Sequence, residues 1–170
     1  MPRLHVCSLA LVAETVERAG ARSLVTLLSP GTSVERPSAI PPERHLYLAV
    51  SDIDAPMPGQ TLPERSHLEE LLAFVRAWDR AEPMLIHCFA GVSRSTAAAF
   101  IAACALNPRR NEFEVARAIR AASPTATPNA RLVALADEAL ERDGRMNEAI
   151  AKIGRGEQCF EGTPFALELV

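Results

Sequence analysis

Long hydrophobic runs and strong charge imbalance are both missing from this sequence of 170 residues. The longest apolar stretches are far too short to span a bilayer, and the N-terminus lacks the pattern of a signal peptide. A net charge of −3 gives no reason to expect nucleic acid as a partner. The sequence therefore predicts a cytoplasmic protein that binds neither membranes nor nucleic acid, and it leaves the oligomeric state open.

Cysteines at metal-binding spacing are missing as well. Cys7, Cys88, Cys104 and Cys159 form no Cys-x2-Cys pair and no Cys/His pattern, so no metal site is expected. Unpaired thiols suit the reducing cytoplasm. Apolar residues make up 48% of the chain and charged residues 23%, which is the ordinary globular range. We therefore expect a single domain over residues 1–170 with one sizeable core.

What is present is one stretch, residues 84–104, around which the chain is organised. Residues 84–86 form a short apolar run after Pro83, which favours a buried strand. The Ala-rich, uncharged residues that follow Arg94 predict a buried helix. A loop that leaves a strand and enters a helix directs backbone N–H groups into one concavity, where the helix N-terminus adds positive charge. An oxyanion fits there, between Cys88 and Arg94.

Each residue type in this loop suits phosphate chemistry. The Cys88 thiol is a nucleophile only as a thiolate, which a helix N-terminus and a nearby cation favour. The planar guanidinium of Arg94 can hold two oxygens of a phosphoryl group. Gly91 allows positive φ and close approach of the backbone to a ligand. Ser95 places a hydroxyl near the sulfur, and His87 is expected beneath the loop, holding its backbone.

The pattern His-Cys-x5-Arg-Ser resembles the signature of the cysteine-based protein tyrosine phosphatases, and the short chain is similar to their compact dual-specificity branch. The resemblance implies that Cys88 is the nucleophile, Arg94 the phosphate clamp and Ser95 the hydroxyl that assists breakdown of the phosphocysteine. It implies hydrolysis of a phosphomonoester, carried by a protein or a small molecule, with no metal or organic cofactor. The residues expected to bind the phosphate are Phe89, Ala90, Gly91, Val92, Ser93 and Arg94.

A phosphatase of this kind needs an acid to protonate the leaving oxygen. Residues 45–50 predict a strand, and Asp52 and Asp54 follow at its exit. In the compact dual-specificity enzymes the acid is an Asp just past a strand, so the resemblance favours Asp52, which is nearer the strand end. Asp54 stays a candidate, and both residues could instead be turn formers.

Two further roles follow from the resemblance alone. The dual-specificity phosphatases carry a Pro-Asn pair before a later helix, where the Asn side chain braces the phosphate-binding loop; Asn129, after Pro128, matches it. Asn129 is also an ordinary helix N-cap. Some relatives protect the nucleophile in a disulfide with a second cysteine, and Cys7 is the candidate here.

The substrate and the turnover itself stay open. The loop interior carries no Lys or His, unlike that of phosphoinositide-directed relatives, and one Tyr in the whole chain gives no deep-pocket aromatic loop. Phosphotyrosine, phosphoserine, phosphothreonine and small-molecule phosphates therefore all remain possible substrates. The alternatives are a phosphate-binding module without turnover and a rhodanese-like sulfurtransferase, although sulfur transfer does not explain Arg94 and Ser95.

The predicted fold is α/β, with a mostly parallel sheet of four or five strands, helices on both faces and the site at the carboxyl ends of the strands. The tail after residue 156 is expected to be irregular and to lie against the domain. The expected strands are 4–7, 23–28, 45–50 and 84–86, and the expected helices are 9–19, one opening at 61–64, one after Arg94, one after Asn111, 130–143 and 145–156.

Overall fold

The chain folds around a five-stranded sheet, as a computed structural model that describes residues 2–169 shows. The strands are β1 (Arg3–Cys7), β2 (Ser23–Leu28), β3 (His45–Ala49), β4 (Met84–His87) and β5 (Phe165–Glu168). Their order in the sheet is β3-β2-β4-β1-β5. The first four are parallel and β5 pairs antiparallel with β1. The mostly parallel α/β fold expected from the sequence is confirmed.

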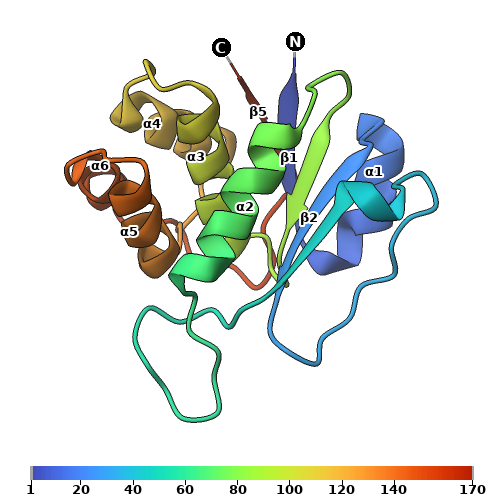
Figure 1. Ribbon diagram of the computed structural model, residues 1–170, viewed down its shortest axis with the longest axis horizontal. Helices are drawn as coiled ribbons and strands as arrows, with labels where there is room; N and C mark the ends of the chain where they lie inside the picture. The colour runs from blue at the N-terminus through green and yellow to red at the C-terminus, as the bar shows by residue number, and fades with distance from the viewer. Residues whose placement is uncertain (1, 170) are drawn as a thin grey trace.

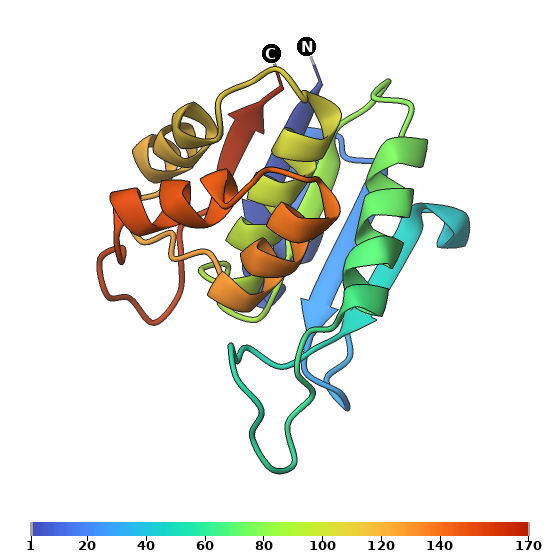
Figure 2. The same ribbon diagram turned by 60° about the vertical axis from the view of Figure 1, so that its left-hand side comes forward.

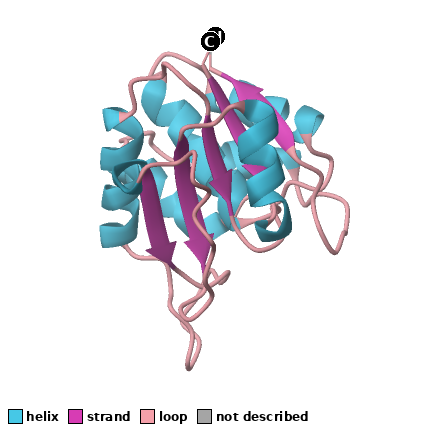
Figure 3. Ribbon diagram, turned by 90° about the vertical axis from the view of Figure 1, so that its right-hand side faces the viewer, coloured by secondary structure: helices cyan, strands magenta, loops and turns pink. Residues whose placement is uncertain are grey.

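Helices cover both faces of this sheet (Figures 1 and 3). The helices are α1 (Val12–Ala19), α2 (Arg65–Ala77), α3 (Arg94–Leu106), α4 (Glu112–Ala122), α5 (Ala130–Ala139) and α6 (Arg145–Ile153). On one face α1 packs Val12 and Val16 against Leu24 and Leu85. On the other, α3 contacts α2, α4 and α5, and α6 packs on α4 and α5 (Figure 2).

Burial explains which segments become the central elements. Every residue of β2 and β4 is buried, as expected for parallel strands covered on both faces. In α3 the buried residues run without interruption from Arg94 to Cys104, which matches its lack of charge after the first turn. The catalytic-loop candidate thus lies between the most deeply buried strand and the most deeply buried helix, so both of its ends are held rigidly.

The tail is the main correction to the predicted fold. Residues Phe165–Glu168 form β5 at the sheet edge rather than an irregular segment, with Val6 opposite Phe165 and Arg3 opposite Glu168. The run has only four residues, two of them buried, which is too short to be recognised as a strand from the sequence. The segment becomes a strand because its backbone pairs with β1, and the local sequence of the tail does not reveal this long-range pairing. It also places the two chain ends side by side (Figure 1).

The helix expected over 130–143 is also wrong at its end, because α5 stops at Ala139. The buried Asp137 accepts hydrogen bonds from the backbone N–H groups of Gly144 and Met146, both at 2.7 Å. A carboxylate at these N–H groups stabilises the start of α6. Gly144, expected to end one helix, therefore caps the next one.

Two other helix starts differ from expectation. The segment expected as a helix from residue 9 begins with a short 3-10 helix, Leu9–Leu11, before α1. The helix expected to open at 61–64 begins at Arg65, with Glu64 as its N-cap. The capping box is closed by His67, whose Nδ1 accepts the N–H of Glu64 at 3.0 Å.

No helix among residues 2–169 is long and apolar enough to cross a membrane.

Candidate active site

The loop between β4 and α3, residues 88–93, is a tight concave turn. Its nucleophile candidate Cys88 is only 2% exposed, and Arg94 at its end is 7% exposed. Gly91 has φ +73°, and a Cβ built there would lie 2.9 Å from the carbonyl carbon of Cys7. Glycine is therefore required on two counts, a left-handed backbone and close contact with the end of β1. The positive φ expected for Gly91 is confirmed, and the close approach to a ligand stays a prediction.

Four carbonyl groups of this loop point outward. They accept hydrogen bonds from backbone N–H groups of neighbouring segments at 2.8–3.1 Å: Leu9 to Phe89, Gly162 to Ala90, Thr127 to Val92 and Asn129 to Ser93. In a trans peptide the N–H points opposite to the carbonyl of the same unit, and the described residues contain no cis peptide. The corresponding N–H groups therefore face into the loop, where they form an anion-binding nest.

The Cys88 sulfur lies within this nest. The Gly91 N–H donates to Sγ at 3.3 Å, and the Ser95 Oγ lies 3.1 Å from Sγ. The N-terminus of α3 adds positive charge beneath it. The Gly91 donor and the helix N-terminus are features that favour a thiolate, the nucleophilic form of cysteine.

Arg94 is held from one side only. Its Nη1 donates to the Val50 carbonyl at 2.9 Å and to the Ser29 Oγ at 3.3 Å. Its Nε is buried and has no hydrogen-bond partner. An unpaired buried donor is costly, and an oxyanion in the loop would supply the missing acceptor. The loop after β2 thus contributes Ser29 to fixing the arginine.

His87 lies beneath the loop in a chain of hydrogen bonds. Its Nδ1 is 3.0 Å from the Cys88 carbonyl, which can only accept, so Nδ1 carries the proton. Its Nε2 then accepts from the Thr26 hydroxyl at 2.8 Å, and Thr26 in turn accepts from His45 Nε2 at 2.8 Å. Burial, chiefly, lowers the pKa of His87 to about 4, so this neutral tautomer is kept at neutral pH. Sequence reasoning missed Thr26, which only strand pairing brings opposite His87.

The other cysteines differ from Cys88. All four thiols are free, so the predicted Cys7–Cys88 disulfide is not formed here and stays a prediction. Burial raises the pKa of Cys7 and of Cys104 to about 12, so both remain protonated thiols near neutral pH. Neither is therefore a candidate nucleophile.

The structure brings Asp52, not Asp54, to the loop. The Asp52 Oδ1 accepts from the Ser93 Oγ at 2.7 Å and from the Asn129 Nδ2 at 3.0 Å. Asp54 is exposed and makes no hydrogen bond or ion pair with any of residues 2–169. Only Asp52 is therefore oriented toward the nucleophile's loop, with Oδ2 left free to carry a proton.

Asn129 acts differently from the expectation based on resemblance. Its side chain does not reach the phosphate-binding loop; the Nδ2 instead holds Asp52 and the Ile53 carbonyl at 3.2 Å. Its Oδ1 caps α5 by accepting the Leu132 N–H at 3.0 Å. The contact with the loop comes from its backbone N–H, which donates to the Ser93 carbonyl. One residue therefore links the helix, the acid loop and the catalytic loop.

The C-terminal segment 155–164 was missed as part of the site. It packs on the outer side of the catalytic loop, and a Cβ at Gly162 would meet the Gly91 carbonyl oxygen at 2.9 Å. A Cβ built at Gly156 would lie 2.6 Å from the carbonyl carbon of Thr125. The two glycines of this segment, Gly156 and Gly162, were the available signal of close backbone approach.

Three hollows surround the loop. One of about 610 Å³ lies between Asp52, Ser93 and Arg155, one of about 450 Å³ between Asp52, Asp54 and Asn129, and one of about 260 Å³ beside Phe89. No three His, Cys, Asp or Glu side chains anywhere in residues 2–169 come together as metal ligands. The hydrogen bonds described above join the loop, its arginine and Asp52 in one candidate site.

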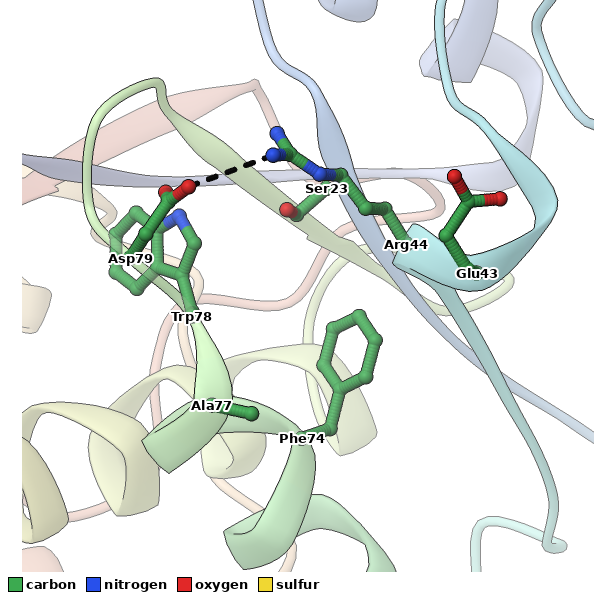
Figure 4. A pocket seen from close by; sticks show the side chains of 7 residues that line it. All are labelled: Ser23, Glu43, Arg44, Phe74, Ala77, Trp78 and Asp79. Carbon is green, nitrogen blue, oxygen red and sulfur yellow. Dashed lines mark hydrogen bonds and ion pairs between the residues drawn. The ribbon is translucent and has the colours of Figure 1, made fainter.

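A separate cavity of about 140 Å³ lies at the amino ends of β2 and β3, far along the sheet from the loop (Figure 4). Its lining includes no cysteine. Its arginine, Arg44, is already paired with Asp79 at 3.4 Å and with Glu82 at 3.1 Å. We therefore regard it as a structural contact between α2 and the strand ends.

Comparison with known proteins agrees with this geometry. A family model described as protein-tyrosine phosphatase matches residues 57–127, which include the whole loop but neither Asp52 nor Asn129. No curated protein sequence gives a match. Human DUSP28 is similar in structure, with a TM-score of 0.63, 22% identity and coverage of 82% of this chain and 92% of that chain.

Two other solved structures give a similar result. A mouse putative dual specificity phosphatase complexed with zinc tungstate has a TM-score of 0.62 at 22% identity, covering 86% of each chain. PTPMT1 in complex with PI(5)P has a TM-score of 0.62 at 14% identity, covering 89% of this chain and 94% of that chain. The resemblance drawn from the sequence is thus confirmed: residues 57–127 match the protein-tyrosine phosphatase family, and the fold is that of the dual-specificity phosphatases.

Proposed function

We propose that this protein is a cysteine-dependent phosphomonoester hydrolase of the protein tyrosine or dual-specificity type. The observation that carries the proposal is the pairing of a buried Cys88 sulfur with inward N–H groups and an unpartnered Arg94 Nε. A bound phosphoryl group would satisfy all of these donors at once. Preorganised donors of this kind are the main source of catalysis in phosphoryl transfer.

In the first proposed step the Cys88 thiolate attacks phosphorus, and the bond to the leaving oxygen breaks. Arg94 and the loop N–H groups hold the non-bridging oxygens, while the proton on Asp52 Oδ2 passes to the leaving oxygen. The products are a phosphocysteine and the free alcohol or phenol.

In the second step water attacks the phosphocysteine, and Asp52, now a carboxylate, takes the proton from that water. The S–P bond breaks and inorganic phosphate leaves. The Ser95 hydroxyl, 3.1 Å from Sγ, would donate to the departing thiolate. Asp52 thus moves one proton in each step, while Arg94 and Ser95 stabilise charge.

The test is hydrolysis of a chromogenic aryl phosphate between pH 4 and pH 8, roughly the range over which thiolate and acid should titrate. We expect Cys88→Ser to abolish turnover while still binding inorganic phosphate. Cys159→Ser, a change at an exposed cysteine outside the loop, is the matched control and should retain turnover. Phosphate binding by a wild-type protein without turnover would favour a binding module instead. Turnover by Cys88→Ser would disprove the proposed mechanism.

A further inference from the structure

An apolar hollow of about 260 Å³ adjoins the catalytic loop. It is lined by Leu9, Ala10, Phe89, Ala90, Phe160 and Glu161. Phe89 and Ala90 are the two residues directly after Cys88, so the hollow shares a wall with the proposed phosphate site. A group that binds here lies immediately next to whatever occupies the loop.

The walls of this apolar hollow are tied to one another. The Leu9 N–H donates to the Phe89 carbonyl at 3.0 Å, and the Gly162 N–H donates to the Ala90 carbonyl at 2.8 Å. The Ser8 hydroxyl donates to the Glu161 carboxylate, linking the end of β1 to the C-terminal segment. The hollow is therefore preformed, which lowers the entropic cost of binding.

Exposed hydrophobic side chains gather around the loop. Four large hydrophobic side chains are exposed among residues 2–169, and three of them, Met57, Phe89 and Phe160, come from the catalytic loop or the segments beside it. Phe89 is 58% exposed and Phe160 is 94% exposed. Two phenyl rings held in water from separate segments favour contact with an apolar partner.

From this arrangement we infer that the apolar hollow binds an aromatic or branched aliphatic side chain that flanks the phosphorylated residue of a peptide or protein substrate. The inference rests on the proposed phosphatase function and adds a substrate class to it. Adjacent residues of a peptide are 3.8 Å apart at Cα, so a side chain one or two positions away can reach Phe89 and Phe160 while the phosphate lies in the loop.

The charges favour a peptide over a lipid. No Lys or Arg lines the apolar hollow, and its one charged wall residue is Glu161. Anionic lipid surfaces are recognised through clusters of basic residues, and none is present here. A volume of about 260 Å³ suits one side chain rather than an acyl chain.

The test uses phosphopeptides in which a single Phe is moved through about three positions on either side of the phosphorylated residue. We expect one position to raise kcat/KM roughly tenfold over the all-Ala parent, the lower end of what filling an apolar pocket provides. Phe160→Ala should reduce that preference to about threefold or less. Met57→Ala, an exposed apolar change on the other side of the loop, should keep it.

Binding of the same peptides to Cys88→Ser gives an independent reading. A Kd for the best Phe peptide that is tenfold lower than that for the all-Ala parent supports the inference. This holds even if the wild-type protein shows no turnover, a result that would contradict only the proposed function. Equal kcat/KM for all peptides, together with turnover of an aryl phosphate, overturns the inference alone. Loss of the preference in Met57→Ala rather than Phe160→Ala also overturns it. The inference is also overturned if neutral lipid vesicles activate hydrolysis while the position of Phe in the peptide has no effect.

Discussion

The carboxylate of Asp52 accepts a hydrogen bond of 2.7 Å from the hydroxyl of Ser93, 41 residues further along the chain. Ser93 is part of the loop that contains the nucleophile, so this bond fixes the proposed acid to the loop it must serve. The Asn129 amide binds the same oxygen from the start of α5. Both donors use Oδ1, which leaves Oδ2 as the oxygen that can present a proton to the leaving group.

Replacing Asp52 by Asn should slow hydrolysis of phenyl phosphate by roughly 10²–10⁴-fold, the usual contribution of a general acid. The loss should be much smaller for a nitro-substituted aryl phosphate, whose leaving oxygen needs no proton. The measurement is kcat across a series of leaving groups. Asp54→Asn is the matched control and should follow wild type; a loss in Asp54→Asn with none in Asp52→Asn would reverse the assignment.

Ser93→Ala should lower kcat on phenyl phosphate by about tenfold with little change in KM, since a hydrogen bond to a charged group contributes about 1.5–3 kcal/mol. Asn129→Ser should act similarly, because serine keeps the cap of α5 while removing the amide donor. As in Asp52→Asn, the loss should shrink for good leaving groups. An equal loss on all substrates would mean that the two residues shape the loop without positioning Asp52.

Stability should depend on pH through His87. Burial, first of all, lowers its pKa in the fold to about 4, below its usual value of 6.5. The unfolded chain therefore binds a proton at His87 at a higher pH than the folded chain does. The stability that neutral His87 contributes is present above pH 6.5 and is lost as the pH falls toward 4. Between pH 7 and pH 5 the expected loss is about 2 kcal/mol.

Urea unfolding at several pH values measures this effect. The variant His87→Asn cannot titrate and should show a shallower fall in the free energy of unfolding over the same range, whatever its stability at pH 7. Parallel curves for the two proteins would show that His87 is not the group responsible.

Gly162→Ala should weaken the site by displacing the loop 88–93 from its outer side. The added Cβ would lie 2.9 Å from the Gly91 carbonyl oxygen and 3.3 Å from a methyl carbon of Val92. Overpacking of this kind costs about 1–3 kcal/mol, and here the atoms that must shift belong to the catalytic loop. We expect kcat/KM and phosphate affinity to fall about tenfold. Thr163→Ala, at the exposed neighbouring position, should change neither; normal activity in Gly162→Ala would show that the segment packs on the loop without supporting it.

The core of the site could be predicted because its signals are local. Strand, loop and helix follow one another within residues 84–106, so the spacing from Cys88 to Arg94 determines their relation without help from distant segments. The helix N-terminus and Gly91 act through the backbone of the same stretch. The same holds for β2 and α3, whose largely apolar, uncharged runs indicate burial.

What the tertiary structure decided is everything that depends on pairing between distant segments. Position along the sequence favoured Asp52 but kept Asp54 as a candidate; only Asp52 is hydrogen-bonded to the Ser93 hydroxyl and the Asn129 amide. Thr26 meets His87 only through strand register, and Gly162 meets Ala90 only because β5 returns to the edge of the sheet. Hydrogen bonds of this kind depend on how distant segments pack together. The loop, the N-terminus of α3 and the candidate nucleophile Cys88 lie within one short stretch, so the local sequence is enough to predict them.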